Sequence, residues 1–181
     1  MSSSALYAPW RMEYIKSLVK TGHSDDGTCF LCEAAAATDD QTRRQRLVLW
    51  QTDQIVVLMN RYPYANGHLL VAPRAHKADL EELTEAEQTA IGIQTTAAVR
   101  LLKNAVSAQG FNVGINLGRI AGAGVPGHLH QHIVPRWGGD INFMHVVGQV
   151  SIVPQATLQL YDELLRILSG VKSEIRSQKS E

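Results

Sequence analysis

The spacing of apolar residues divides the chain into short extended runs and longer segments with helical periodicity. Short apolar runs bounded by turn residues predict strands, and they lie at residues 47–51, 54–59, 68–73, 111–117, 128–134 and, as a possible extra strand, 146–153. Apolar positions three and four residues apart predict amphipathic helices, which lie at residues 10–19, 84–110 and 157–171. Residues 34–37 and 41–46 follow neither pattern, so we expect an exposed connection there.

The order of these elements predicts a mixed α+β fold. Thr84 and Glu87 form a capping box that opens the long helix, and Gly110 is well placed to end it. Because predicted strands lie on both sides of one long helix, we expect a largely antiparallel sheet packed against that helix.

Length and composition limit the class of protein. The chain has 181 residues, 45% of them hydrophobic, with a formal net charge of zero and a pI near 7.1. This balance argues against a nucleic-acid polymer as the partner but allows a small anionic ligand. No repeat or low-complexity segment divides the chain, so residues 1–181 are expected to form one domain. Its core should lie in about residues 29–153, with the helices at 10–19 and 157–171 appended.

Neither a membrane span nor a secretory signal is apparent in the chain. No apolar run approaches the roughly 20 residues that cross a bilayer. Residues 1–20 lack the apolar segment of a secretory signal. We therefore expect a cytoplasmic protein with no membrane partner.

Three histidines alternate in the segment His-Leu-His-Gln-His at residues 128–132. Successive side chains on a strand point to opposite faces, so His128, His130 and His132 would share one face. A lone histidine is usually an ordinary surface or core residue, but three in alternation beside a glycine-rich loop indicate a site. A zinc ion held by all three is unfavourable, because the outer two would lie roughly 13 Å apart. A neighbouring pair could still share an ion.

Two further features carry candidate chemistry. The two cysteines, Cys29 and Cys32, have the spacing of metal or redox sites, and two buried thiols without a ligand are the plainer alternative. A loop directly before the histidines contains four glycines, at Gly118, Gly122, Gly124 and Gly127. Such a loop is either a flexible connection or a cradle whose amides approach a phosphate.

These motifs together resemble the histidine triad (HIT) family. The segment from His128 to Val134 fits the family signature, Asn60 stands eight residues before His68, and Asn116-Leu-Gly118 precedes the glycine loop. Residues 8–11, 59–64 and 135–140 narrow the resemblance to the bacterial branch that includes diadenosine tetraphosphate phosphorylases and related hydrolases. Two positions depart from the pattern: Gln131 replaces an apolar residue, and Gly124 stands where a Gln or Ser is common.

The resemblance implies a fold and a set of site residues. It implies a five-stranded, mostly antiparallel sheet and a homodimer. His130 would be the nucleophile that attacks the α-phosphate, with His132 and His68 supporting it as the other catalytic residues. A backbone carbonyl could fix the tautomer of the nucleophile. The substrate-binding residues would be Asn60, Asn116, the four loop glycines, and Leu58 and Ile55 in an apolar nucleoside slot, with Phe30 a weaker candidate. Arg119 and Arg136 are further candidates for charge near the phosphates.

The resemblance also implies a metal site. Zinc-binding members of the wider family use a cysteine pair, a histidine after a strand and the first histidine of the triad. Carried onto this sequence, the ligands of a structural zinc ion are Cys29, Cys32, His76 and His128.

The expected function is therefore cleavage of a nucleoside polyphosphate, with diadenosine tetraphosphate as the leading substrate. The reaction would pass through a covalent nucleotidyl-histidine, with water or inorganic phosphate as the acceptor. A nucleoside phosphoramidase is the alternative enzyme. A non-catalytic nucleotide sensor and a zinc-stabilised interaction domain are alternatives from other classes.

Overall fold

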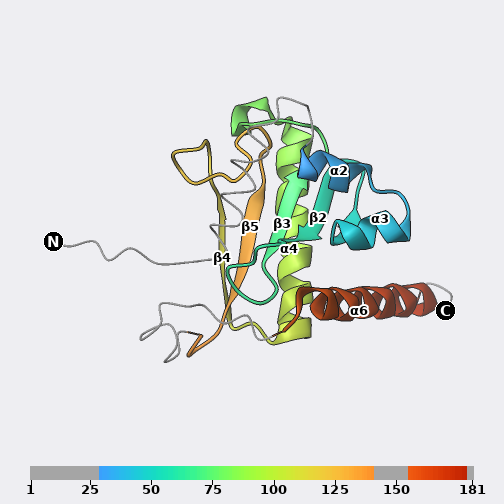
Figure 1. Ribbon diagram of the computed structural model, residues 1–181. Coiled ribbons are helices and arrows are strands. Elements are labelled where there is room, and N and C mark those ends of the chain that lie inside the picture. Colours follow the sequence, from blue (N-terminus) through green and yellow to red (C-terminus); the bar gives the residue numbers. More distant parts are fainter. Residues whose placement is uncertain (1–28, 141–154, 179–181) are drawn as a thin grey trace. The chain divides into compact units, whose positions relative to one another are not determined.

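The computed structural model describes residues 29–140 and 155–178 (Figure 1). The predicted helix at 10–19 and the predicted strand at 146–153 lie outside the described residues. The described elements are α2 (Phe30–Ala36), α3 (Asp40–Gln45), β1 (Val48–Gln51), β2 (Ile55–Met59), β3 (Leu69–Pro73), a 3-10 turn (Leu80–Glu82), α4 (Glu85–Val106), β4 (Gly110–Ile115), β5 (Gln131–Arg136) and α6 (Thr157–Gln178). They all belong to one compact unit. Every helix in this part of the chain is too short or too polar to span a bilayer.

The five strands form one antiparallel sheet in the order β1-β2-β3-β5-β4. The predicted α+β class and the five-stranded antiparallel sheet are thus confirmed. β5 lies between β3 and β4, so each residue of its first half has a neighbour on both sides. His132, for example, is paired with Leu70 of β3 and with Gly114 of β4.

The sheet is covered on both faces at its centre. On one face, Ile55, Val57 and Met59 of β2 join a core that includes buried residues of α4 and α6. On the other face, Val56 and Leu58 join a smaller core with α2. Figure 1 shows α4 running along the strands that it packs against.

The segment before β1 corrects one prediction. Residues 34–37 and 41–46 are not an exposed connection, because α2 and α3 occupy most of this segment. α2 buries Leu31, Ala34 and Ala35 against the sheet. A helix of two turns whose buried face is largely alanine shows little hydrophobic periodicity, so the pattern did not reveal it.

The long helix begins where the sequence predicts. Thr84 accepts a hydrogen bond from the Glu87 amide, and the Glu87 side chain accepts one from the Thr84 amide. The helix ends at Val106, earlier than predicted, because Ser107 adopts a left-handed conformation with φ 50°. Gly110 therefore begins β4 and does not end the helix.

β5 starts three residues later than predicted. The Leu129 amide donates to the Lys77 carbonyl over 2.6 Å, and the His128 amide donates to the Val125 carbonyl over 3.3 Å. These donors are thus satisfied by loops, so residues 128–130 lead into the sheet and only residues 131–136 join the ladder.

Candidate active site and metal centre

The histidines lie on the sheet face opposite α4. Leu129 and Ile133 belong to the core on the α4 face, and the Gln131 side chain donates to the Thr95 hydroxyl of α4 over 2.5 Å. Alternation therefore places His130 and His132 on the other face, as the sequence pattern predicts. The rings of these two residues lie edge to face, with centroids 5.0 Å apart.

The tautomer of His130 is fixed by the backbone carbonyl of His128. Nδ1 of His130 lies 2.8 Å from the carbonyl oxygen of His128. A carbonyl only accepts, so Nδ1 carries the proton and the ring's lone pair is on Nε2. The side chain is 5% exposed, and this burial lowers its pKa below the ordinary value of 6.5. His130 is therefore a neutral imidazole near pH 7, with a nucleophilic nitrogen at Nε2.

A second hydrogen-bond chain begins at Asn60. The Tyr62 amide donates to Asn60 Oδ1 over 3.0 Å, which fixes the orientation of the Asn60 side chain. Asn60 Nδ2 then faces His68 Nδ1 at 3.2 Å and donates to it. The Tyr64 amide donates to the same Nδ1, also over 3.2 Å. His68 therefore keeps its lone pair on Nδ1 and its proton on Nε2.

This chain continues into the triad. His68 Nε2 lies 3.0 Å from His132 Nδ1 and donates to it. His132 must then carry its own proton on Nε2. Burial, followed by the neighbouring histidines, lowers the pKa of His68 to about 3 and that of His132 to about 4. Both rings are therefore neutral near pH 7.

The chain ends at a buried donor. Among the residues that the structure describes, His132 Nε2 is a buried side-chain nitrogen without a hydrogen-bond partner. A buried polar group of this kind costs about 1–3 kcal/mol, and natural sites keep such a group where a ligand satisfies it. An N–H donor on the ring that packs against the His130 ring suits an oxygen of a phosphate group.

Tyr64 is a site residue that the sequence analysis did not select. Its ring lies over those of His68 and His132, with centroids 4.7 Å and 6.0 Å away. The available signal was an aromatic residue in a turn-rich segment four residues before His68.

The four glycines of the loop before the histidines have different surroundings. Gly118 and Gly122 have φ of 74° and 93°, which favours glycine for conformational reasons. The Gly122 amide donates to the Arg119 carbonyl over 3.0 Å, so this amide is used within the loop. A Cβ on Gly127 would lie 3.4 Å from His76, which places Gly127 beside a member of the Cys/His cluster. The Asn116 amide group lies near Gly122, and Gly124 is half-buried.

The predicted nucleoside slot needs a correction. Ile55 is fully buried in the core that packs against α4, whereas Leu58 lies in the core beneath α2. The two residues are on opposite faces of β2, because odd and even positions of a strand face opposite ways. Ile55 is therefore wrong as a slot residue. Leu58 is on the histidine face but 2% exposed, and Phe30 at the start of α2 is 39% exposed.

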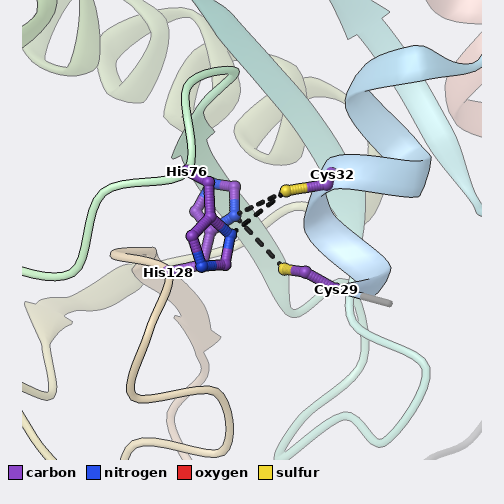
Figure 2. Close-up of side chains that lie close together, drawn as sticks. All are labelled: Cys29, Cys32, His76 and His128. Carbon is purple, nitrogen blue, oxygen red and sulfur yellow. Dashed lines mark hydrogen bonds between the residues drawn. The ribbon is translucent and has the colours of Figure 1, made fainter. Parts of the chain in front are cut away.

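Two cysteines and two histidines converge beside the triad. Figure 2 shows Cys29 and Cys32 at the start of α2 facing His76, from the loop after β3, and His128. Their four ligand atoms lie within 4.8 Å of one another. Nδ1 of His128 lies 3.2 Å and 3.4 Å from the two sulfurs, and Nδ1 of His76 lies 3.2 Å from Cys32.

The geometry of this cluster fits a metal ion. A tetrahedral zinc ion with bonds of about 2.1–2.3 Å holds its ligand atoms about 3.4–3.8 Å apart, close to the spacing here. Nε2 of His128 donates to the Pro73 carbonyl over 2.8 Å, so the lone pair on Nδ1 points at the sulfurs. Burial and the adjacent Cys29 raise the pKa of Cys32 to about 11. A dication would offset this effect and hold both sulfurs as thiolates.

Comparison of the sequence with known proteins identifies the family of this chain. The HIT domain family model matches residues 41–139, so the chain belongs to the HIT family. It is 35% identical over 150 residues to AP-4-A phosphorylase of Mycobacterium tuberculosis, covering 83% of this chain and 76% of that protein. It is 33% identical over 95 residues to bis(5'-nucleosyl)-tetraphosphatase [asymmetrical] of Schizosaccharomyces pombe, covering 52% of each chain.

Comparison of the fold with solved structures also finds histidine triad proteins. The crystal structure of a zinc-bound histidine triad family protein from Mycobacterium smegmatis matches with a TM-score of 0.63 and 21% identity, covering 81% of this chain and 97% of that one. The family model and the fold therefore agree that the chain is a HIT-family protein.

The neutral histidine pair predicts a pH dependence of stability. The unfolded chain takes up protons on His68 and His132 near pH 6.5, but the native state does not until about pH 3 and about pH 4. The free energy of unfolding should therefore fall as the pH falls from 6.5 towards 4, by up to about 1.4 kcal/mol per pH unit for each group. Urea unfolding at several pH values measures this slope.

The matched variant for this experiment is His132→Gln, which keeps the four residues of the Cys/His cluster. It should show a shallower slope than the parent over the same range, because one of the two groups is gone. Equal slopes in the two proteins would contradict the assignment of a neutral, buried His132.

Proposed function

We propose that the protein is a nucleotidyl transferase or hydrolase that cleaves nucleoside polyphosphates at the α-phosphorus, with diadenosine tetraphosphate as the leading substrate. The observation that carries the proposal is that neighbouring imidazole rings have opposite tautomers. His130 has its lone pair on Nε2, and His132 has a buried proton on Nε2 that meets no acceptor among the described residues. One ring can attack phosphorus while the other donates to a phosphate oxygen.

The first step is a displacement at phosphorus. Nε2 of His130 forms a bond to the α-phosphorus, and the bond from that phosphorus to the bridging oxygen breaks. The polyphosphate leaves with the electron pair. His132 Nε2–H stabilises the negative charge that gathers on the phosphoryl oxygens. The His128 carbonyl accepts from Nδ1 throughout and stabilises the positive charge on the His130 ring.

The second step regenerates the ring. Water or inorganic phosphate attacks the phosphorus, the bond to Nε2 breaks, and the attacking oxygen loses its proton to solvent. Water as the acceptor yields AMP and ATP from diadenosine tetraphosphate, and inorganic phosphate yields ADP and ATP. Dividing one difficult displacement into two easier ones is the usual advantage of a covalent intermediate.

The names of two relatives support this substrate class. The relative from Mycobacterium tuberculosis is an AP-4-A phosphorylase, and the one from Schizosaccharomyces pombe is a bis(5'-nucleosyl)-tetraphosphatase. The alignment with the first covers 83% of the present chain at 35% identity. A homodimer in the cytoplasm is part of the proposal and rests on the family resemblance.

We also propose that Cys29, Cys32, His76 and His128 hold a structural zinc ion. Their ligand set of two sulfurs and two imidazoles closes a tetrahedral site, so no position remains for substrate. The ion would join the start of α2, the loop after β3 and the residues that lead into β5. It would thereby hold in place the His128 carbonyl that orients His130.

The nucleophile is tested by His130→Ala. Turnover of diadenosine tetraphosphate should fall by about a thousandfold or more, because the covalent step has no substitute. Binding of AMP should persist, since the donor from His132 remains. Product analysis with and without inorganic phosphate measures turnover, and calorimetry measures AMP binding.

Two results would count against this mechanism. If His130→Ala cleaves the substrate as fast as the parent, His130 is not the nucleophile. If the parent binds AMP but cleaves no dinucleoside polyphosphate or nucleotide–amine conjugate, the protein is a nucleotide sensor.

The metal is tested by elemental analysis of protein prepared without chelators. We expect about one zinc ion per chain, and a large drop in melting temperature after removal, since structural zinc contributes about 10–16 kcal/mol in small peptides. Cys32→Ser should lose the ion and show the same drop. Glu33→Gln, the next residue along α2, should retain the ion. Metal-free protein with an unchanged melting temperature would disprove the zinc site.

A further inference from the structure

The peptide group between His128 and Leu129 is held on both sides. Its carbonyl oxygen accepts from Nδ1 of His130 over 2.8 Å, and its N–H donates to the Lys77 carbonyl over 2.6 Å. A trans peptide group points its N–H and its C=O in opposite directions, so it joins these two hydrogen bonds end to end. The carbonyl that fixes the tautomer of His130 is therefore itself held in place by the loop after β3.

The peptide group between Lys77 and Ala78 continues this chain of hydrogen bonds. The Ala78 amide donates to Oε2 of Glu82 over 2.6 Å, while the Lys77 carbonyl accepts from Leu129. Both peptide groups are trans. Three hydrogen bonds thus run without interruption from the Glu82 carboxylate, through two peptide groups, to the imidazole of the nucleophile.

All three hydrogen bonds point the same way. The imidazole donates to a carbonyl, each peptide N–H donates to the next acceptor, and the last acceptor is a carboxylate, which only accepts. Hydrogen bonds in such a chain polarise one another, by about 10–30% per bond in condensed phase. The charge of Glu82 therefore makes the His128 carbonyl a better acceptor for the Nδ1 proton of His130.

The burial of the chain changes along its length. His128, Leu129 and His130 are each 5% exposed or less, so water competes little with the two bonds nearest the nucleophile. Glu82, at the far end, is exposed, so solvent screens part of its charge. We therefore expect a moderate effect on His130, smaller than that of a carboxylate in direct contact.

Capping of the 3-10 turn does not account for the contact with Ala78. In a capping box, the third residue of the turn accepts from the N-cap amide. Glu82 does so with the Asp79 amide, but over 3.4 Å. Its bond to the Ala78 amide, one residue earlier, is shorter at 2.6 Å. The carboxylate thus lies closer to the donor that leads to the active site than to the donor that capping requires.

A second carboxylate fixes the position of Lys77. Nζ of Lys77 lies 2.6 Å from Oε2 of Glu87, a buried residue in the first turn of α4. The same oxygen accepts from the Thr84 amide over 2.8 Å. Lys77 is thus anchored to the start of α4 by its side chain, which helps to keep its carbonyl in place for the Leu129 amide.

We infer that Glu82 is a positioning residue for the nucleophile, which acts on His130 through the peptide groups 77–78 and 128–129. The inference rests on the proposed function. No proton moves along the chain, because each peptide N–H keeps its own. The chain stabilises the positive charge that the His130 ring acquires when Nε2 bonds to phosphorus, as a directly bonded carboxylate does for the histidine of a serine protease.

The test is Glu82→Ala in the full-length protein, with Glu81→Ala as the matched control. Glu81 is the exposed preceding residue of the same turn, so its removal changes the net charge equally. Glu82→Ala should lower the single-turnover rate of diadenosine tetraphosphate cleavage about tenfold, the low end for loss of a hydrogen bond to a charged group. The Kd for AMP should change by less than about twofold. Glu81→Ala should change neither quantity.

Glu82→Gln separates the charge from the cap. Glutamine also completes a capping box, and its amide oxygen accepts from Ala78 without carrying a charge. The melting temperature should therefore equal that of the parent. The cleavage rate should lie between those of the parent and Glu82→Ala.

NMR of the free protein reports on the chain without turnover. In Glu82→Ala, the amide proton of Leu129 and the Nδ1 proton of His130 should both shift upfield, because each hydrogen bond in the chain weakens. A role confined to the 3-10 turn would leave both signals unchanged. Glu81→Ala should also leave them unchanged.

The outcomes separate this inference from the proposed function. A parent protein that cleaves no dinucleoside polyphosphate overturns the proposed function, whatever the NMR signals show. If the parent is active, unshifted signals in folded Glu82→Ala overturn the inference alone. A cleavage rate within about twofold of the parent does the same, as does an equal loss of AMP binding and cleavage. If Glu82→Ala does not fold, a Glu82→Gln protein with the rate and signals of the parent overturns the inference.

Discussion

The proton positions of the site depend on backbone amides that are only able to donate. The amides of Tyr62 and Tyr64 set the direction of a hydrogen-bond chain that passes through Asn60 and His68 and reaches His132. Reversing the direction at any point would leave two donors or two acceptors facing each other in a buried environment, which is costly. The turn between β2 and β3 therefore determines that His132 presents a proton and not a lone pair.

His128 connects the two centres of the molecule. Its side chain belongs to the cluster with Cys29, Cys32 and His76, and its carbonyl accepts from His130. The ring of His130 is thus oriented by the backbone of a residue whose own ring is held by the cluster. A metal ion in the cluster would act on catalysis through position alone, because its four ligands leave no coordination site for a substrate oxygen.

Much of this arrangement could be predicted from alternation and spacing, and some of it could not. The strand periodicity placed the triad on one face, and the capping box at Thr84 placed the start of α4. The error at Ile55 came from assigning Ile55 and Leu58 of β2 to the same slot. Their positions differ by three, an odd number, so their side chains lie on opposite faces of the sheet. The short helix α2 has too few turns for a periodic signal.

The sequence could not identify which atoms accept the hydrogen bonds that fix the tautomers, and the reason is different. The carbonyls of His128 and Pro73 are backbone atoms, which every residue carries, so residue type says nothing about their role. The family resemblance implied that Asn60 and His68 belong to the site, but only the fold shows that the amide NH2 faces the imidazole.

The most direct measurement of this account is the tautomeric state of the three histidines by nitrogen-15 NMR of the imidazole rings near pH 7. The account predicts that His130 carries its proton on Nδ1, and that His68 and His132 carry theirs on Nε2. A proton on Nε2 of His130, or on Nδ1 of His132, would contradict it, because the nucleophilic nitrogen and the phosphate donor would then be absent.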